Sequence, residues 1–286
     1  MRFLFVVDLH GDEESYETAL LVAREGGAAA VVNGGDLLTH GLRNAFAGQR
    51  AFLRWLRGHW SAARDAGLAN FAMFGNDDAR ALVGELDAMA VDGLVTRLDG
   101  GGWIDLPGSG SDRTGAGGWT VLGFPWVPDP PFRLKDWCRH DDRARRSPPQ
   151  FGTPLFSTPS GLVDAEADAL ARLPTIEDEL AALPAPPDRA RAILVAHGPP
   201  AGIGLGTTGD RRDVGSQASA RYLERSGFPL SLHGHIHESP HVTGRWWGRL
   251  GRTVCVNPGA MERPPWVLVD LDARTLEHRT LGATTF

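Results

Sequence analysis

Two histidines near the C-terminal end are the residues of this sequence with the clearest potential for metal chemistry. They lie two positions apart in the motif Gly234-His235-Ile236-His237. On an extended backbone, side chains two positions apart point to the same side, so both imidazoles would face one place. Imidazole is a common ligand of Zn, Mn, Fe and Ni. The motif therefore predicts a metal site, provided that other ligands reach the same place.

Other groups of Asp, Asn and His follow apolar runs elsewhere in the chain. The groups are Asp8 and His10 after residues 3–7, Asp36 after 28–32, Asn76, Asp77 and Asp78 after 69–74, and His197 after 192–196. Such runs are typical of strands that are covered on both faces. Taken alone, each polar group also fits an ordinary turn. Because sites of α/β folds gather at the carboxyl ends of strands, the repetition predicts one shared site.

The elements that would position these groups alternate between strand and helix. Helices are predicted near 13–24, over 44–65, over 165–183 with an interruption at Pro174, and over 216–225 with Ser216 as its cap. Further strands are predicted over 119–124, 230–233, 253–256 and 266–270. This alternation predicts an α/β fold.

The composition is that of an ordinary globular protein. The 286 residues are 42% hydrophobic and 22% charged, which is enough for a sizeable core. A net charge of -6 argues against a general nucleic-acid or membrane surface. The two cysteines form no Cys-x-x-Cys pair, which fits a reducing cytosol, and no run reaches the roughly 18 apolar residues of a membrane span. We therefore expect a cytoplasmic protein.

The ordered motifs resemble those of the calcineurin-like metallophosphoesterase superfamily, above all its bacterial and archaeal phosphoesterases. The matching segments are Asp8-x-His10, Gly35-Asp36, Gly75-Asn76, His197 and Gly234-His235-x-His237. The resemblance implies a four-layer αββα sandwich, in which two mixed sheets are flanked by helices. It also implies a dinuclear metal site at the strand ends. Because the sequence has no internal repeat and no low-complexity tail, we expect one domain over residues 1–286.

The resemblance assigns a role to each polar residue. Asp8, His10 and His237 would bind one metal, Asp36 would bridge both metals, and Asn76, His197 and His235 would complete the second. Oxygen and imidazole donors without a thiolate suit divalent Mn, Fe, Zn or Ni. Two such ions would generate a hydroxide near neutral pH and neutralise charge on the phosphoryl group.

One position departs from the family pattern. The family usually has a histidine after Gly-Asn, and this chain has Asp77. An ionised carboxylate would repel phosphate, whereas a neutral one with a raised pKa could donate a proton. We expect Asn76 and Asp77 to be catalytic; the alternatives are an ester that needs little protonation, or donation by His40 or His241. Asp78 could orient a ligand and could also cap the next helix, and the two roles are compatible.

A segment rich in Pro, Arg and aromatic residues, at about 125–160, predicts an insertion without a regular strand or a long helix. It could cap the metal site and use its arginines to grip a second phosphate or a sugar-phosphate backbone. Alternatively, it is a solvated loop that packs Trp126 and Trp137 on the core.

The resulting functional hypothesis is a metal-dependent phosphoesterase that acts on a small phosphate ester. Phosphodiesters of the nucleotide or cyclic nucleotide type are the expected substrates. The alternatives are a phosphomonoesterase or protein phosphatase, and a non-catalytic interaction protein with the same fold. We expect no membrane partner and no nucleic-acid partner, because the net charge is acidic and the sequence has no stripe of basic residues. The sequence leaves the oligomeric state open.

Overall fold

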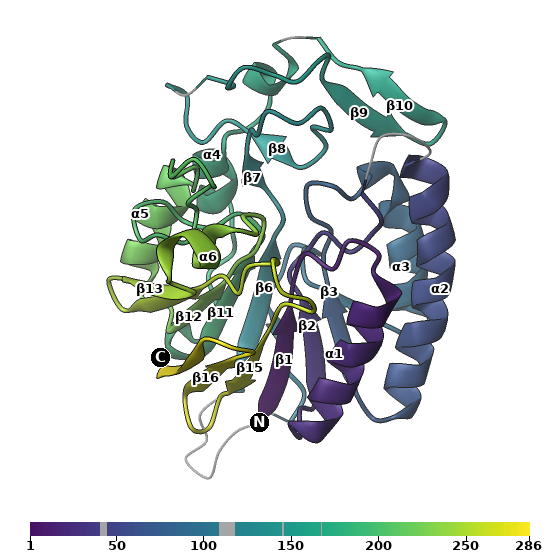
Figure 1. Ribbon diagram of the computed structural model, residues 1–286, viewed down its shortest axis with the longest axis vertical. Helices are drawn as coiled ribbons and strands as arrows, with labels where there is room; N and C mark the ends of the chain where they lie inside the picture. The colour runs from purple at the N-terminus through teal and green to yellow at the C-terminus, as the bar shows by residue number, and fades with distance from the viewer. Residues whose placement is uncertain (41–44, 109–117, 145, 167) are drawn as a thin grey trace.

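The computed structural model describes residues 1–40, 45–108, 118–144, 146–166 and 168–286, and within them two sheets lie face to face (Figure 1). The first sheet has the order β17 (Gly282–Thr285), β16 (Thr275–His278), β15 (Trp266–Asp270), β1 (Arg2–Val6), β2 (Ala30–Asn33), β3 (Ala69–Ala72) and β4 (Thr96–Arg97). The second sheet has the order β13 (Trp247–Leu250), β14 (Thr253–Val256), β12 (Leu230–Leu232), β11 (Ala192–Ala196), β6 (Thr120–Phe124) and β5 (Ile104–Asp105).

Helices cover the outer face of each sheet, which completes four layers (Figure 1). The first sheet carries α1 (Glu13–Glu25), α2 (Ala45–Asp65), the short η1 (Arg80–Leu82) and α3 (Val83–Val91). The second carries α4 (Ile176–Ala181) and α5 (Gln217–Ser226), with η2 (Ala169–Arg172), η3 (Arg189–Arg191) and α6 (Ser239–Thr243) in the connections. Within the described residues, none of these helices combines the length and the apolar character that crossing a bilayer requires.

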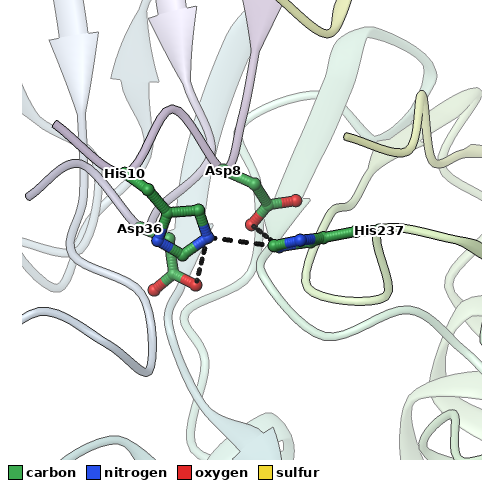
Figure 2. Close-up of side chains that lie close together, drawn as sticks. All are labelled: Asp8, His10, Asp36 and His237. Carbon is green, nitrogen blue, oxygen red and sulfur yellow. Dashed lines mark hydrogen bonds and ion pairs between the residues drawn. The ribbon is translucent and has the colours of Figure 1, made fainter. Parts of the chain in front are cut away.

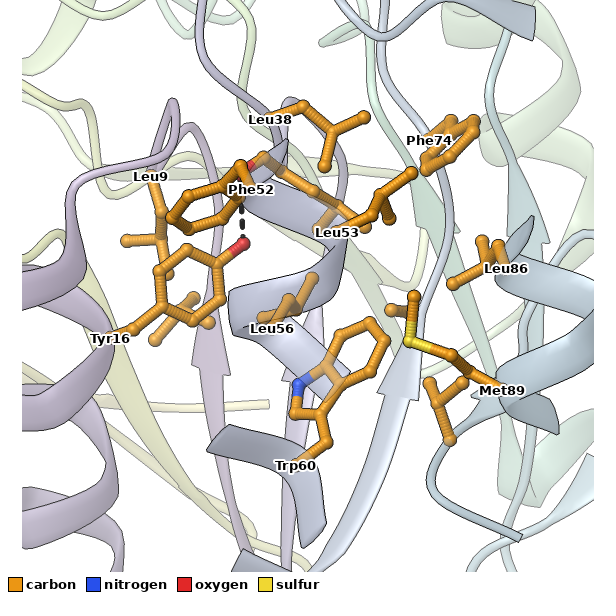
Figure 3. Close-up of a cluster of buried hydrophobic side chains, with 14 of the residues drawn as sticks. Leu9, Tyr16, Leu38, Phe52, Leu53, Leu56, Trp60, Phe74, Leu86 and Met89 are labelled. Atoms are coloured by element: carbon orange, nitrogen blue, oxygen red, sulfur yellow. Dashed lines mark hydrogen bonds between the residues drawn. The ribbon is translucent and has the colours of Figure 1, made fainter. Parts of the chain in front are cut away.

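Strand β1 shows why the layers form. Phe3 and Phe5 belong to the core between the two sheets, whereas Leu4 and Val6 belong to the core under the helices. Successive side chains of a strand point to opposite faces, so a run that is apolar throughout needs a layer on each side. Figure 3 shows the core under the helices, where Tyr16 packs beside residues of α2 and donates a hydrogen bond to the carbonyl of Leu37.

The strand directions bring the predicted polar groups to one edge. β1, β2 and β3 are parallel neighbours in the first sheet, and β11, β12 and β14 are parallel neighbours in the second. β15 runs antiparallel to β1, and β13 runs antiparallel to β14, so both sheets are mixed, as predicted. The carboxyl ends of the parallel strands meet where the two sheets adjoin.

Most predicted elements agree with the structure, and one helix agrees only in part. The strands predicted over 192–196, 253–256 and 266–270 have those bounds, and Ser216 caps α5 by accepting a hydrogen bond from Ser219 N. The helix predicted over 165–183 is confirmed only in part: η2 and α4 lie on either side of the predicted interruption at Pro174, and the rest of the described segment is not helical. Thr175 and Asp178 form a capping box that starts α4 immediately after Pro174. Residue 44 lies outside the described residues.

The insertion at about 125–160 is more ordered than the sequence predicts. It contains β7 (Val127–Pro128) and β8 (Cys138–Arg139), and it ends in a hairpin of β9 (Leu155–Thr158) and β10 (Gly161–Asp164). The prediction of no regular strand is therefore wrong at its C-terminal end. The prediction that its tryptophans pack on the core is confirmed, since Trp137 is buried in the core under the helices and Trp126 packs against it. Residue 145 is outside the described part of the chain.

A buried ion pair holds the insertion together. The ammonium of Lys135 lies 2.6 Å from Asp129 Oδ1 and 2.6 Å from the carbonyl oxygen of Pro130. Both charged side chains are almost fully buried, at 2% and 3% exposure. Removing one partner of such a pair leaves the other charge buried without compensation, which is costly.

We predict that Asp129→Ala lowers the free energy of unfolding by about 3 to 5 kcal/mol, because it leaves the Lys135 ammonium buried and unpaired. Asp92→Ala is the matched control: its pair with Arg57 has side chains that are 51% and 45% exposed, and its loss should cost less than about 1 kcal/mol. Urea denaturation followed by tryptophan fluorescence measures both. Equal losses for the two variants would contradict the prediction.

Candidate metal centre

The predicted polar groups converge from loops that extend five strands. Backbone hydrogen bonds continue the pairing of β1 with β2 beyond the strand ends, from Asp8 N to the Gly35 carbonyl at 3.0 Å and from His10 N to the Asp36 carbonyl at 2.9 Å. In the second sheet, Gly234 N donates to the carbonyl of His197 at 3.0 Å, which extends the pairing of β11 with β12 in the same way. The loops are thus held by the backbone, whatever their side chains bind.

Asp8, His10, Asp36 and His237 form a first group, whose ligand atoms all lie within 4.8 Å of one another (Figure 2). His10 Nε2 lies 3.2 Å from His237 Nε2 and 3.7 Å from Asp36 Oδ2. His237 Nε2 lies 3.7 Å from Asp8 Oδ1. Four nitrogen and oxygen atoms therefore face one small volume, although they come from residues as far apart in the sequence as Asp8 and His237.

His197 lies at the centre of a second group, on the other side of Asp36. Its Nδ1 bonds the carbonyl of Gly34 at 3.0 Å, which leaves Nε2 facing Asn76 Oδ1 at 3.0 Å and Asp36 Oδ2 at 3.3 Å. Asn76 Nδ2 donates to Asp77 Oδ1, so its oxygen is free for this contact. The ring of His235 lies 5.4 Å from that of His197. Lone pairs of nitrogen and oxygen that face one another in this way repel unless a proton or a metal cation lies between them.

Two buried carboxylates dominate the electrostatics. Asp8 and Asp36 are 0% and 2% exposed, and in the described part of the chain their ion-pair partners are histidines alone. Burial favours a raised pKa for each carboxyl, but His237 beside Asp8 and His197 beside Asp36 lower both pKa values. Conversely, burial opposes protonation of His197, yet Asp36 and Asp8 raise its pKa to about 9. The site thus requires positive charge, and its donor set fits divalent metal ions.

The backbone at these residues is left-handed. Asp8, His10, Asp36 and His235 have φ values of 55°, 47°, 52° and 67°. Non-glycine residues rarely adopt this conformation, and it occurs where the surrounding structure imposes it, often at functional sites. The prediction that His235 and His237 share one side of an extended strand is therefore wrong. β12 ends at Leu232, and the following turn directs His235 toward His197 and His237 toward His10.

Three glycines allow the loops to approach one another. A Cβ atom at Gly75 would lie 2.7 Å from His197 Nε2 and closer still to Asp36. One at Gly35 would lie 2.6 Å from His197 Nδ1, and one at Gly234 would lie 2.6 Å from Asp8 Oδ2. Real Cβ atoms do not tolerate such distances. These glycines are needed for space rather than only for turning.

Asp78 holds two of the loops in register. Its carboxylate accepts hydrogen bonds from Leu37 N at 3.0 Å, Leu38 N at 2.8 Å and Gly75 N at 2.8 Å. The additional prediction, that Asp78 caps the following helix, is wrong, because Ala79 is the N-cap of η1. Asp78 instead ties the loop after β2 to the loop after β3.

Two further residues, Asn257 and His233, hold the loops of the centre in place, and the sequence did not predict these roles. The side chain of Asn257 donates to the carbonyls of Gly234 at 3.3 Å and Ile236 at 3.1 Å, which fixes the His-x-His turn. His233 Nδ1 lies 2.9 Å from the carbonyl of Ala196, at the end of β11. Neither role has a local signal beyond the position of each residue next to a strand end.

Asp77 lies at the rim of the centre. Its Oδ2 lies 3.8 Å from His10 Nδ1, and its backbone N–H donates to Asp36 Oδ1 at 2.8 Å. Burial and the nearby Asp36 raise the pKa of Asp77 to about 7. His40 also reaches the rim, with its ring 4.9 Å from that of His10. By contrast, His241 is exposed on α6 and, among the described residues, has no hydrogen bond or ion pair to the centre.

Comparisons with known proteins agree on the fold. The family model described as calcineurin-like phosphoesterase matches residues 1–239. Protein TT1561 of Thermus thermophilus has a TM-score of 0.51 at 18% identity, over 98% of each chain. A dimetal phosphatase from Danio rerio has a TM-score of 0.50 at 12% identity, over 99% of this chain and 96% of that one. An archaeal phosphodiesterase has a TM-score of 0.45 at 12% identity, over the whole of both chains. No curated protein matches the sequence significantly.

We predict that Gly75→Ala weakens binding of Mn²⁺ by about 10- to 100-fold, because the added methyl group displaces Asp36 and His197. Gly84→Ala is the matched control. Gly84 lies in α3 with no atom within 4 Å of an added Cβ, so this change should leave binding intact and stabilise the helix by about 1 kcal/mol. Calorimetric titration with Mn²⁺ and thermal unfolding measure the two effects. Unchanged Mn²⁺ affinity in Gly75→Ala would contradict the steric argument.

Proposed function

The chain belongs to the calcineurin-like phosphoesterase family, and we propose that it hydrolyses phosphodiesters at a centre of two divalent metal ions. The family's description implies a hydrolase of phosphate esters, and its members generally bind divalent metals. The observation that carries the proposal is the convergence of buried carboxylate, amide and imidazole groups on both sides of Asp36, with histidines as the only ion-pair partners of Asp8 and Asp36 in the described residues.

The proposed ligand sets follow from the two groups of side chains. Asp8, His10 and His237 would hold one ion, and Asn76, His197 and His235 would hold the other. Asp36 would bridge the ions, since its Oδ2 lies 3.7 Å from His10 Nε2 and 3.3 Å from His197 Nε2. Mn, Fe, Zn and Ni suit this donor set. When bound, the ions would supply a water nucleophile near neutral pH and would offset the charge of the phosphoryl group.

The protein groups around the ions would hold and orient them. The bond from His197 Nδ1 to the Gly34 carbonyl fixes which ring nitrogen faces the centre. His235 N donates to both oxygens of Asp8, at 3.2 and 2.9 Å, so a backbone group from the second sheet orients a carboxylate from the first. These bonds prepare the ligand geometry before any ion arrives.

Asp77 supports the choice of diesters over monoesters. A monoester carries close to two negative charges at neutral pH, whereas a diester carries one. The Asp77 carboxyl lies at the rim, where its ionised form would repel the more highly charged substrate more strongly. Asn76 would act with Asp77 there, as a ligand whose amide also donates to the Asp77 carboxyl. We propose nucleotide or cyclic nucleotide diesters as the substrate type.

We predict that protein stripped of metal by a chelator has no activity, and that Mn²⁺, Fe²⁺, Zn²⁺ or Ni²⁺ restores it. The restored enzyme should cleave bis-p-nitrophenyl phosphate with a higher kcat/KM than p-nitrophenyl phosphate. Release of p-nitrophenolate measures both reactions. A higher kcat/KM for the monoester would indicate a phosphomonoesterase, and no cleavage with any metal would indicate a non-catalytic protein.

We predict that Asp36→Asn lowers kcat/KM for bis-p-nitrophenyl phosphate by about 100-fold or more, because it removes the bridging charge while keeping the shape of the side chain. Asp105→Asn is the matched control, since Asp105 is an exposed carboxylate on β5, and it should leave kcat/KM unchanged. Metal content by mass spectrometry should fall in the first variant only. Full activity of Asp36→Asn would contradict the proposed bridge.

We predict that Asp77→His raises the turnover of a diester with a poor leaving group, such as methyl phenyl phosphate, about tenfold or more. An imidazole at this position could protonate the leaving oxygen, a type of contribution that reaches about 10²–10⁴ in established cases. Asp77→Asn is the control, because it removes the carboxyl charge without adding a donor of suitable pKa. If both variants gain equally, the effect comes from the lost charge and not from proton donation.

A further inference from the structure

A cavity of about 460 Å³ opens beside the candidate metal centre. It lies between the start of α2 and the insertion, whose β9–β10 hairpin stands above the N-terminal end of α2 (Figure 1). Pockets for small molecules typically measure about 300–1,000 Å³, so the cavity has the volume of a ligand site. None of the proposed metal ligands lines the cavity, and Asp77 is the lining residue that it shares with the proposed function.

The walls of the cavity are mainly apolar and aromatic. Phe46 comes from α2, and Phe132, Leu134, Phe151 and Leu162 come from the insertion and its hairpin. The rings of Phe132 and Phe151 meet edge to face, with centroids 5.9 Å apart. They are 53% and 72% exposed, among the largest exposures of any apolar side chain in the described residues. Exposed apolar side chains gathered around a hollow mark a binding site more often than a structural need.

The cavity is continuous with the metal centre. Asp77 and His40 line it on the side of the centre. Both also belong to a group with His10, whose ligand atoms lie within 4.8 Å of one another. A molecule with its phosphate at the metal ligands would therefore place an attached organic group in this cavity.

The polar groups of the cavity are mostly engaged. Gln49 donates to the carbonyls of Thr39 and Asp77 and accepts from Ala79 N, so its amide is fully used by the protein. Arg133 Nε donates to the carbonyl of Thr153. Apart from Asp77, the terminal nitrogens of Arg133 and the ring of His40 are the polar groups that remain, and they are outnumbered by apolar and aromatic side chains in the lining. Aromatic walls instead favour a flat ring, which can stack on or meet their faces and edges.

We infer that this cavity seats a flat aromatic group of the phosphate ester, such as a nucleobase or an aryl ring, while the phosphate lies at the metal ligands. The inference rests on the proposed function and adds the class of organic group that the enzyme selects. It also assigns Phe132 and Phe151 as specificity-determining residues, and it leaves Arg133, which lines the cavity, as the arginine of the insertion placed to contact a second phosphate. Two other arginines of the insertion are engaged elsewhere: Arg139 stacks on Trp126, and Arg143 pairs with Asp178.

The experiment compares three phosphonates that share one head group and are not hydrolysed. Calorimetric titration of the Mn²⁺-loaded protein with phenylphosphonate, cyclohexylphosphonate and methylphosphonate measures the three dissociation constants. We expect phenylphosphonate to bind about tenfold more tightly than methylphosphonate and about threefold more tightly than cyclohexylphosphonate. Phe151→Ala and Phe132→Ala should each weaken phenylphosphonate about three- to tenfold and leave methylphosphonate unchanged.

Val163→Ala is the matched control for these variants. Val163 neighbours Leu162 in β10 and is 44% exposed, and alternation along the strand points its side chain away from the cavity. It should bind all three phosphonates like the unaltered protein. Equal affinities for phenylphosphonate and cyclohexylphosphonate, or an equal loss for every phosphonate in Phe151→Ala, would overturn the inference.

A second measurement separates this inference from the proposed function. Saturation-transfer NMR with benzyl alcohol on the metal-free protein tests the cavity without a phosphate or a metal. We expect a signal in the unaltered protein and in Val163→Ala, and a loss of signal in Phe151→Ala. If this pattern appears while no ester is cleaved, the inference that the cavity binds an aromatic group is supported and the proposed hydrolysis is contradicted. If esters are cleaved but benzyl alcohol does not bind, the proposed hydrolysis is supported and the inferred aromatic site is contradicted.

Discussion

Two carboxylates that are buried next to each other are the constraint on which this structure depends. Asp8 and Asp36 lie at the edge where the two sheets meet, and ionised carboxylates are costly there unless positive charge compensates them. In the described residues, only imidazoles form ion pairs with them. The protein can meet the constraint with protons on histidines or with metal ions. The raised pKa of His197 shows the first solution, which bound cations would replace.

The fold must bring distant parts of the chain together before this centre exists. Asp8 and His237 meet only when the first sheet packs against the second, because they come from the loop after β1 and from the turn after β12. The apolar layer between the sheets, which includes Phe5 and Val195, drives that packing. It must also support the left-handed backbone at four of the candidate ligands, a strain of about 1 kcal/mol or more at each residue. Hydrophobic burial therefore sustains a geometry that the local backbone disfavours.

Sequence patterns predicted the elements that depend on local periodicity. They did not predict side-chain directions and partners that depend on contacts between distant parts of the chain. The buried strands and the positions of the polar groups after them followed from apolar runs and glycines. The direction of the His235 side chain could not be predicted from such patterns, because the backbone there forms a left-handed turn and not the expected extended strand. The role of Asp78 depends on three backbone partners from two loops, which no spacing reveals. The cavity is lined by Phe46 and Phe151, and nothing in the chain between them indicates that they share a wall.

Asp78 links the metal centre to the cavity. The carboxylate of Asp78 holds the loops that carry Asp36 and Asn76, and its backbone carbonyl accepts a hydrogen bond from the indole of Trp137 at 2.8 Å. Trp137 belongs to the insertion, which also supplies Phe151 to the cavity. Asp78 is therefore one of the residues that fix the distance between the proposed site of reaction and the proposed site of selection, together with Asp136 and Ser157 of the insertion, which accept hydrogen bonds from Arg80 N and Ala81 N. Because most of the cavity wall comes from the insertion, changes there can alter the organic group that is accepted without moving the ligands, as long as the contact between Trp137 and Asp78 persists.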